Sequence, residues 1–230
     1  MYHPFVRLED LGIIGNGQFA ALIDQRATIV WCCLPRFDAE PVFGALLDPE
    51  GGDFGIGPAD DRAQASTAYL ENTNILETRF HGKDGAFRVV DFAPRFLEHQ
   101  RMFHPAQIVR IVEPIDGAPV IRVRCRPCRG WSREGVTPMP GSNHLDYGGF
   151  DASLRLTTDY PLSALDGRPT TLNGTRHFVL SWGAPVEEPL APLTRRFLDA
   201  TRNHWQQWVK ECNLPPLFQR LRRLAPTVII

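Results

Sequence analysis

The pattern of apolar and polar positions divides this chain into two parts. Up to about residue 188, short apolar or alternating segments are separated by glycine, proline and aspartate. Strands at intervals of about 8–12 residues with such punctuation are typical of an antiparallel sandwich. We therefore predict a mainly β fold, an antiparallel β-sandwich, over residues 1–188. No alternation of strand and helix appears, which argues against a dinucleotide-binding fold.

The first strands are marked by two breaks in an apolar stretch. Asn16-Gly17 is a strong turn signal between Ile13-Ile14 and Ala20–Ile23, and residues 24–27 form a weaker polar break before Ile29. Later turns are expected at Lys83–Gly85, at Asn173-Gly174, and at Pro114–Gly117 between two paired strands. The later strands are expected at 67–70, 75–81, 87–92, 107–112, 120–126, 152–157, 170–172 and 177–182.

Beyond residue 188 the apolar period changes from two to 3.6. After a proline-rich connector with Pro185, Pro189 and Pro192, apolar positions at steps of three and four predict one face of a helix. That face comprises Phe197, Thr201, Trp205, Trp208 and Cys212. A second helix is expected from Leu217 and Leu221, interrupted at Pro226. Residues 189–230 are thus expected to form a linker and the first helices of a truncated helical domain.

Two such helices cannot cover their own apolar faces. Either they pack on the sandwich, or they belong to a larger helical domain. We expect the faces around Phe197, Trp205, Trp208, Leu217 and Leu221 to be incompletely covered. We therefore expect self-association through them, because large exposed apolar patches drive association.

One window near the N-terminus carries a family resemblance. Gly15-Asn16-Gly17, Ala20–Asp24, Trp31, Leu34–Asp38 and Pro41–Phe43, followed by Leu46-Leu47-Asp48, occur in order. This window resembles the N-terminal domain of bacterial glucoamylase-like and trehalase-like enzymes of glycoside hydrolase family 15. The tail is similar as well, with Trp205, Trp208-Val209 and Leu214-Pro215 resembling the start of that family's helical domain.

The resemblance implies a fold and an activity for full-length relatives. The fold is a β-sandwich of the super-sandwich type followed by an (α/α)6 barrel. The reaction is inverting hydrolysis of an α-glucosidic bond, with one glutamic acid protonating the leaving oxygen and a second glutamate activating water. Both glutamates lie on the barrel, and no position here matches either one, so we assign no catalytic residue. We expect a non-catalytic N-terminal domain that meets an α-glucoside through the barrel. The alternative is a free-standing carbohydrate-binding or protein-interaction module derived from that family.

Five residues are candidates for positions next to a sugar: Arg36, Asp38, Trp31, Asn143 and His144. Arg36 and Asp38 follow a strand that Pro35 ends, and they either hold sugar hydroxyls or form a salt bridge that fixes the turn. Trp31 either stacks on a sugar or belongs to the core. Asn143 and His144 either project toward a neighbouring domain or cap their own loop.

Composition narrows the classes of partner. With 25 basic and 26 acidic residues, the net charge of −1 does not indicate binding to nucleic acid or to an anionic membrane. No apolar run approaches the roughly 20 residues that span a bilayer, and the start lacks a signal peptide, so we expect a cytoplasmic protein. Its five cysteines are then expected to be reduced thiols, including Cys125 and Cys128 at a CxxC spacing. No histidine spacing indicates a metal site, and no cofactor is expected.

The alternating arginines Arg122, Arg124 and Arg126 share one face of a predicted strand. That face is either an anionic or polysaccharide groove, or a solvated surface that nearby carboxylates neutralise. Because only Trp131 supplies an aromatic side chain nearby, the pattern favours the solvated surface.

Overall fold

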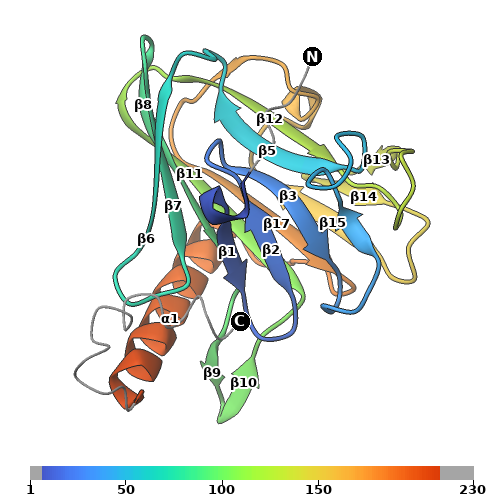
Figure 1. Ribbon diagram of the computed structural model, residues 1–230, viewed down its shortest axis with the longest axis vertical. Helices are drawn as coiled ribbons and strands as arrows, with labels where there is room; N and C mark the ends of the chain where they lie inside the picture. The colour runs from blue at the N-terminus through green and yellow to red at the C-terminus, as the bar shows by residue number, and fades with distance from the viewer. Residues whose placement is uncertain (1–6, 213–230) are drawn as a thin grey trace.

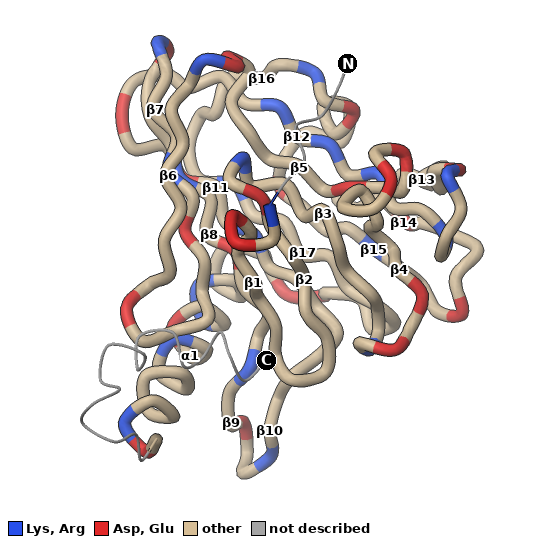
Figure 2. The backbone as a smooth tube through the Cα atoms, viewed as in Figure 1, with Lys and Arg blue, Asp and Glu red and all other residues tan. Residues whose placement is uncertain are grey.

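The computed structural model describes residues 7–212. Two antiparallel sheets pack face to face, and one long helix lies against the outer face of the larger sheet (Figure 1). The predicted antiparallel sandwich is therefore confirmed. Lys, Arg, Asp and Glu gather mostly in the turns and at strand ends (Figure 2). Within residues 7–212, no helix is long and apolar enough to cross a membrane.

The smaller sheet has seven strands. Its order is β1-β2-β3-β5-β12-β16, and β4 pairs with β3 beside this path. The strands are β1 (Gly12–Gly15), β2 (Ala20–Ile23), β3 (Thr28–Cys33), β4 (Pro41–Phe43), β5 (Asp53–Pro58), β12 (Val120–Arg126) and β16 (Thr170–Thr171).

The larger sheet has eight strands in the order β13-β14-β15-β17-β11-β8-β7-β6. They are β6 (Gln64–Tyr69), β7 (Leu76–Gly82), β8 (Gly85–Phe92), β11 (Gln107–Gly117), β13 (Pro138–Pro140), β14 (His144–Tyr147), β15 (Leu154–Thr158) and β17 (Arg176–Trp182). A separate two-stranded ribbon pairs β9 (Phe96–Glu98) with β10 (Arg101–Phe103), and short 3-10 turns occur at η1 (Leu8–Asp10) and η2 (Leu162–Ala164).

The main core lies between the two sheets. It is built from the side chains that point inward, which are every second residue along a strand. Phe54 of β5 meets Phe178 of β17 edge to face, with ring centroids 6.2 Å apart. Both rings are fully buried. Burial of apolar side chains from both sheets is the main stabilising contribution to a sandwich of this kind.

A charged side chain crosses this apolar layer. Arg110 of β11 is fully buried and donates two hydrogen bonds to Asp91 of β8, at 2.7 and 3.1 Å. Two further donors of its guanidinium reach across to the smaller sheet, where the carbonyl oxygens of Phe54 and Ala27 accept at 2.6 and 2.5 Å. The guanidinium also lies 4.6 Å from the centroid of the Phe54 ring. The two sheets are thus joined by polar bonds as well as by apolar contact.

The predicted hairpin between 107–112 and 120–126 is wrong. β11 continues to Gly117 and pairs with β8 along its length, with a bulge between Pro114 and Asp116, whereas β12 belongs to the opposite sheet. Proline has no N–H for a regular ladder, and a bulge accommodates it. Gly117, at φ +66°, packs so closely on Asp84 that a Cβ would lie 2.8 Å from its carbonyl oxygen. The chain therefore crosses between sheets where a tight turn was expected.

The helix α1 (Leu190–Glu211) packs on the larger sheet rather than standing free. Phe197 and Trp205 are each 5% exposed, which corrects the expectation that the faces around them are uncovered. The buried face continues to Val209 instead of Trp208, which is half-buried. Pro192 lies inside the first helical turn, where a proline removes no helical hydrogen bond, so it is not part of the connector. The second expected helix, with Leu217 and Leu221, lies outside the described residues.

The Asn16-Gly17 turn fixes the end of the sandwich to α1. The Asn16 amide donates to the carbonyl oxygens of Pro94 and Pro105, at 3.3 and 2.7 Å. Arg95 donates to the carbonyl oxygen of Asn16 and, at 3.2 Å, to the ring of His204 on α1. Burial and the neighbouring guanidinium lower the pKa of His204, which keeps the ring neutral and able to accept this bond. The Asn16-Gly17 turn therefore connects the β1–β2 hairpin with the segments at Pro94 and Pro105 and, through Arg95, with α1.

We expect Phe197→Ala to lower the free energy of unfolding by about 3–5 kcal/mol, because it leaves a cavity among Phe96, Phe103 and α1. Urea unfolding of the purified chain measures this. Asn203→Ala, at an exposed position of the same helix, is the matched control and should change stability by less than about 0.5 kcal/mol. Equal stability of the two variants would mean that α1 does not pack on the sandwich in solution.

Candidate functional site

Arg36 and Asp38 lie in the loop between β3 and β4, after a cis peptide bond at Leu34-Pro35. Arg36 donates two parallel hydrogen bonds to the Asp38 carboxylate, both at 3.0 Å. The Arg36 guanidinium lowers the pKa of Asp38. Both side chains remain more than two-thirds exposed, so solvent screens the pair. The geometry fits a salt bridge across the turn, and it also leaves both groups reachable by a ligand.

Trp31 lies on the outer side of β3 and is half-buried. Its ring meets that of Trp131, with centroids 5.9 Å apart and planes inclined by 46°. Trp131 itself is 71% exposed, although aromatic side chains of this size usually bury most of their surface. Sequence reasoning missed this partner, and the available signal was that Trp131 is the lone aromatic in an arginine-rich segment.

The loop of residues 127–136, which we call the Trp131 loop, is held at both ends. The Cys128 amide donates to the Val42 carbonyl oxygen at 2.9 Å, and the Val136 amide donates to that of Pro127 at 2.9 Å. Arg133 pairs with Asp48 of the β4–β5 connection at 2.5 Å. The exposed ring of Trp131 is therefore presented by a braced loop. We call Trp31, Trp131 and the Asp48–Arg133 pair the tryptophan face.

Asn143 and His144 occupy another place, at the turn between β13 and β14. The His144 ring contacts the Asn143 side-chain oxygen at 3.2 Å and the Asp146 carboxylate at 3.4 Å. It also covers Gly141, where a Cβ would lie 2.3 Å from the ring. Arg155 holds Asp146 through two bonds of 2.7 and 2.9 Å and lowers the pKa of that carboxyl. These contacts close a local turn.

The five candidates therefore do not form one cluster. Among residues 7–212, no hydrogen bond, ion pair or ring contact joins the Arg36–Asp38 pair to the tryptophans, and none joins Asn143 or His144 to either. Trp31 and its partner Trp131 are the aromatic pair that the fold brings together from distant parts of the sequence.

Each buried carboxylate in the described part of the chain has an arginine partner. Asp91 pairs with Arg110, Asp53 with Arg124, and Glu77 with both Arg79 and Arg88. A general acid needs a carboxyl group that can keep and release a proton near neutral pH. These three carboxylates are instead held in ion pairs with arginines, so we assign them a structural role.

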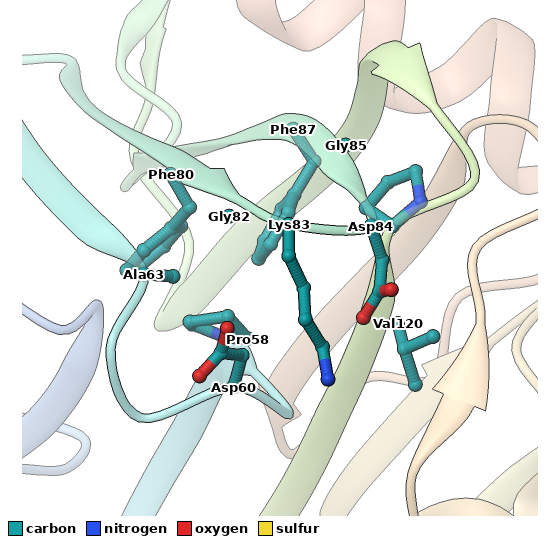
Figure 3. A pocket seen from close by; sticks show the side chains of 11 residues that line it. Pro58, Asp60, Ala63, Phe80, Gly82, Lys83, Asp84, Gly85, Phe87 and Val120 are labelled. Carbon is teal, nitrogen blue, oxygen red and sulfur yellow. The ribbon is translucent and has the colours of Figure 1, made fainter.

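The two thiols of the CxxC spacing and the hollow beside the β7–β8 hairpin have other characters than those of a reactive site. Burial raises the pKa of Cys125 to about 12, and it also raises that of Cys128, so both thiols stay protonated. No group of three His, Cys, Asp or Glu side chains within 7–212 is placed to hold a metal ion. The hollow beside the β7–β8 hairpin, where Lys83 extends near Asp60 and Asp84, has a volume of about 10 Å³ (Figure 3). That is room for about one water molecule.

Residues 3–147, more than half of the chain, match the family described as trehalase-like, N-terminal. The chain belongs to this family. No solved structure matches the chain significantly.

Curated relatives agree with this assignment. A trehalase of Mycolicibacterium smegmatis is 28% identical over 98% of this chain, and one of Mycobacterium tuberculosis is 27% identical over 98%. Trehalase 1 of Sulfolobus acidocaldarius is 44% identical over 38% of the chain. The matched regions cover 38%, 37% and 15% of those proteins, so this chain spans well under half the length of each relative.

We expect Arg36→Ala and Asp38→Ala each to shift the melting temperature by less than about 2 °C, because an exposed pair stabilises little. Asp53→Ala is the contrasting control. Asp53 is 7% exposed and pairs with Arg124, so its loss should lower the melting temperature by about 4–8 °C. Calorimetry compares the three. A drop for Arg36→Ala as large as that for Asp53→Ala would show that the exposed pair braces the fold.

Proposed function

We propose that this chain is the non-catalytic N-terminal domain of a trehalase-like glycoside hydrolase. Hydrolysis of the α-glucosidic bond is then the work of a helical domain that follows the sandwich. The family match and the trehalases that align along nearly the whole chain support this proposal. Membership of glycoside hydrolase family 15, trehalose as the substrate and a cytoplasmic location are further parts of it.

The observation that carries the proposal is that the buried carboxylates are paired with arginines. An inverting glycosidase needs two carboxyl groups about 6.5–9.5 Å apart, one of them protonated at the start of the reaction. Here the buried carboxylates are bound by arginines, by Arg110 inside the core and by the partly exposed Arg124 and Arg88 elsewhere. The length of the relatives that this chain leaves unmatched, about three fifths of the M. smegmatis protein, is ample for a separate catalytic domain.

The tryptophan face is our candidate for the surface that serves the sugar site. Trp131 presents a large exposed ring on a braced loop, and the same loop carries Arg133, which pairs with Asp48. Exposed aromatic side chains with polar neighbours mark surfaces that bind ligands or other domains. We propose that this face, with Arg36 and Asp38 in the adjoining β3–β4 loop, lies toward the catalytic domain and borders the bound α-glucoside.

A free-standing carbohydrate-binding module is the second candidate function. The exposure of Trp131 favours it, because such a ring can stack on a sugar without help from another domain. The two functions differ in what the isolated chain does. A module binds a glucan by itself, whereas a domain that only borders a catalytic site has no need to.

We expect the purified chain to release no glucose from trehalose, maltose or starch, since we assign no acid and base pair to it. A coupled glucose assay against a mock preparation measures this. Affinity electrophoresis in soluble starch, comparing the wild-type chain with Trp131→Ala, separates the two candidates, and retardation of the wild type alone would favour the free-standing module. Glucose release that a point substitution such as Glu134→Gln abolishes would overturn the non-catalytic role.

A further inference from the structure

The sandwich is open along one margin. There β12 of the smaller sheet faces β13 and β14 of the larger one, and no ladder joins the two sheets. A groove of about 650 Å³ lies between them, lined by β12, β13, β14 and the η2 segment. This volume is within the range of small-molecule sites, about 300–1,000 Å³.

Two features of the strands keep this margin open. β16 has two residues and pairs with Val120 and Ile121, and the segment before it reaches β12 through a bridge of Asp166 with Arg124 and a bond from the Gly167 amide to the Val123 carbonyl oxygen. On this side, the described residues supply no strand partner for Cys125 and Arg126 at the end of β12. On the other side, Pro138 and Pro140 flank the single non-proline residue of β13, and a proline has no N–H with which to extend a sheet. The inter-sheet core consequently reaches the surface here.

The lining of the groove is largely apolar. Cys125, Leu145 and Leu165 belong to the inter-sheet core, and Val136 and Leu162 pack against it. Burial raises the pKa of the Cys125 thiol to about 12, so this part of the groove lining is uncharged. A neutral sugar, which needs several hydrogen-bonding groups, is a poor match for such a surface, whereas an alkyl chain or ring system fits it.

The groove also carries one cation without an acidic partner. Arg124 is paired with Asp53, and Asp166 is paired with Arg168 at 2.9 Å. For Arg126, no carboxylate of the described residues lies within 4.0 Å, and its one hydrogen bond goes to the Arg133 carbonyl oxygen at 3.1 Å. Gly135 makes room for this side chain, since a Cβ there would lie 2.9 Å from the Arg126 Nε. The positive charge at the groove is thus held in place and unneutralised.

We propose that this groove binds a small free amphipathic anion. Its apolar chain or ring system lies between the sheet margins against Leu145, Val136 and Leu162. Its carboxylate or sulfonate accepts charge-assisted hydrogen bonds from the Arg126 guanidinium, whose fork suits a two-oxygen anion. This site is independent of the proposed sugar-related function. Neither Trp31 nor Trp131 lines it, and it is linked to the tryptophan face through the Arg133 carbonyl oxygen, which accepts from Arg126.

Isothermal titration of the full chain with decanoate tests the proposal. We expect one decanoate to bind per chain. Arg126→Gln should raise the dissociation constant about tenfold, because the charge-assisted hydrogen bonds are lost. Arg122→Gln is the matched control, because Arg122 is exposed on the same strand but does not line the groove. Val136→Trp, which fills the groove, should abolish binding, and far-UV circular dichroism checks that this variant is folded.

Two further probes fix the chemical class. Decanol should bind the wild type about as weakly as decanoate binds Arg126→Gln, and decyltrimethylammonium should not bind. The proposal is overturned if decanoate does not bind, if Arg126→Gln binds as tightly as Arg122→Gln, or if the ammonium compound binds as well as the anion. Retention of the chain on phosphatidylglycerol vesicles, lost in Arg126→Gln, would overturn the assignment to a free ligand in favour of a membrane lipid.

Discussion

The buried pair of Arg110 and Asp91 is the constraint on which the arrangement of the two sheets depends. A charge removed from water is costly unless every donor finds a partner. Asp91 comes from the same sheet as Arg110, but the carbonyl oxygens of Ala27 and Phe54 come from the opposite one. Because those backbone atoms must lie at fixed positions, the pair sets how β11 sits over β5 and over the β2–β3 turn. Apolar contact alone would tolerate more than one register.

That arrangement positions the surfaces to which we assign functions. The β2–β3 turn, closed by bonds from the Arg26 and Thr28 amides to Asp24, leads directly into β3, which carries Trp31 and then the Arg36–Asp38 loop. At the far margin the same sheets separate and leave the groove beside Arg126. One braced segment, residues 127–136, contributes to both surfaces, because Trp131 and Arg133 of this loop belong to the tryptophan face and Val136 lines the groove.

Local signals in the sequence predicted many of the strands, because turn chemistry is local, but β5, β13 and β14 were not among the predicted strands. Asn16-Gly17 and Lys83–Gly85 are turns for reasons that each dipeptide carries in itself. The path of β11 could not be predicted in this way, because its bulge at Pro114 and its crossing to the other sheet depend on partners distant in sequence. The burial of Trp205 and the pairing of Trp31 with Trp131 are likewise tertiary, and nothing within either segment specifies the other. The family was recognisable since its motif is a continuous stretch around that same first hairpin.

A double-mutant cycle on Arg110 and Asp91 tests most directly whether this pair holds the sheets together. The variants are Arg110→Met, Asp91→Leu and the two combined, each unfolded in urea. If the pair joins the sheets, each single change should cost about 3–5 kcal/mol by leaving one buried charge unpaired. The double variant should then lose clearly less than the sum of the two. Single changes that each cost under about 1 kcal/mol and add without coupling would contradict the central role of this pair.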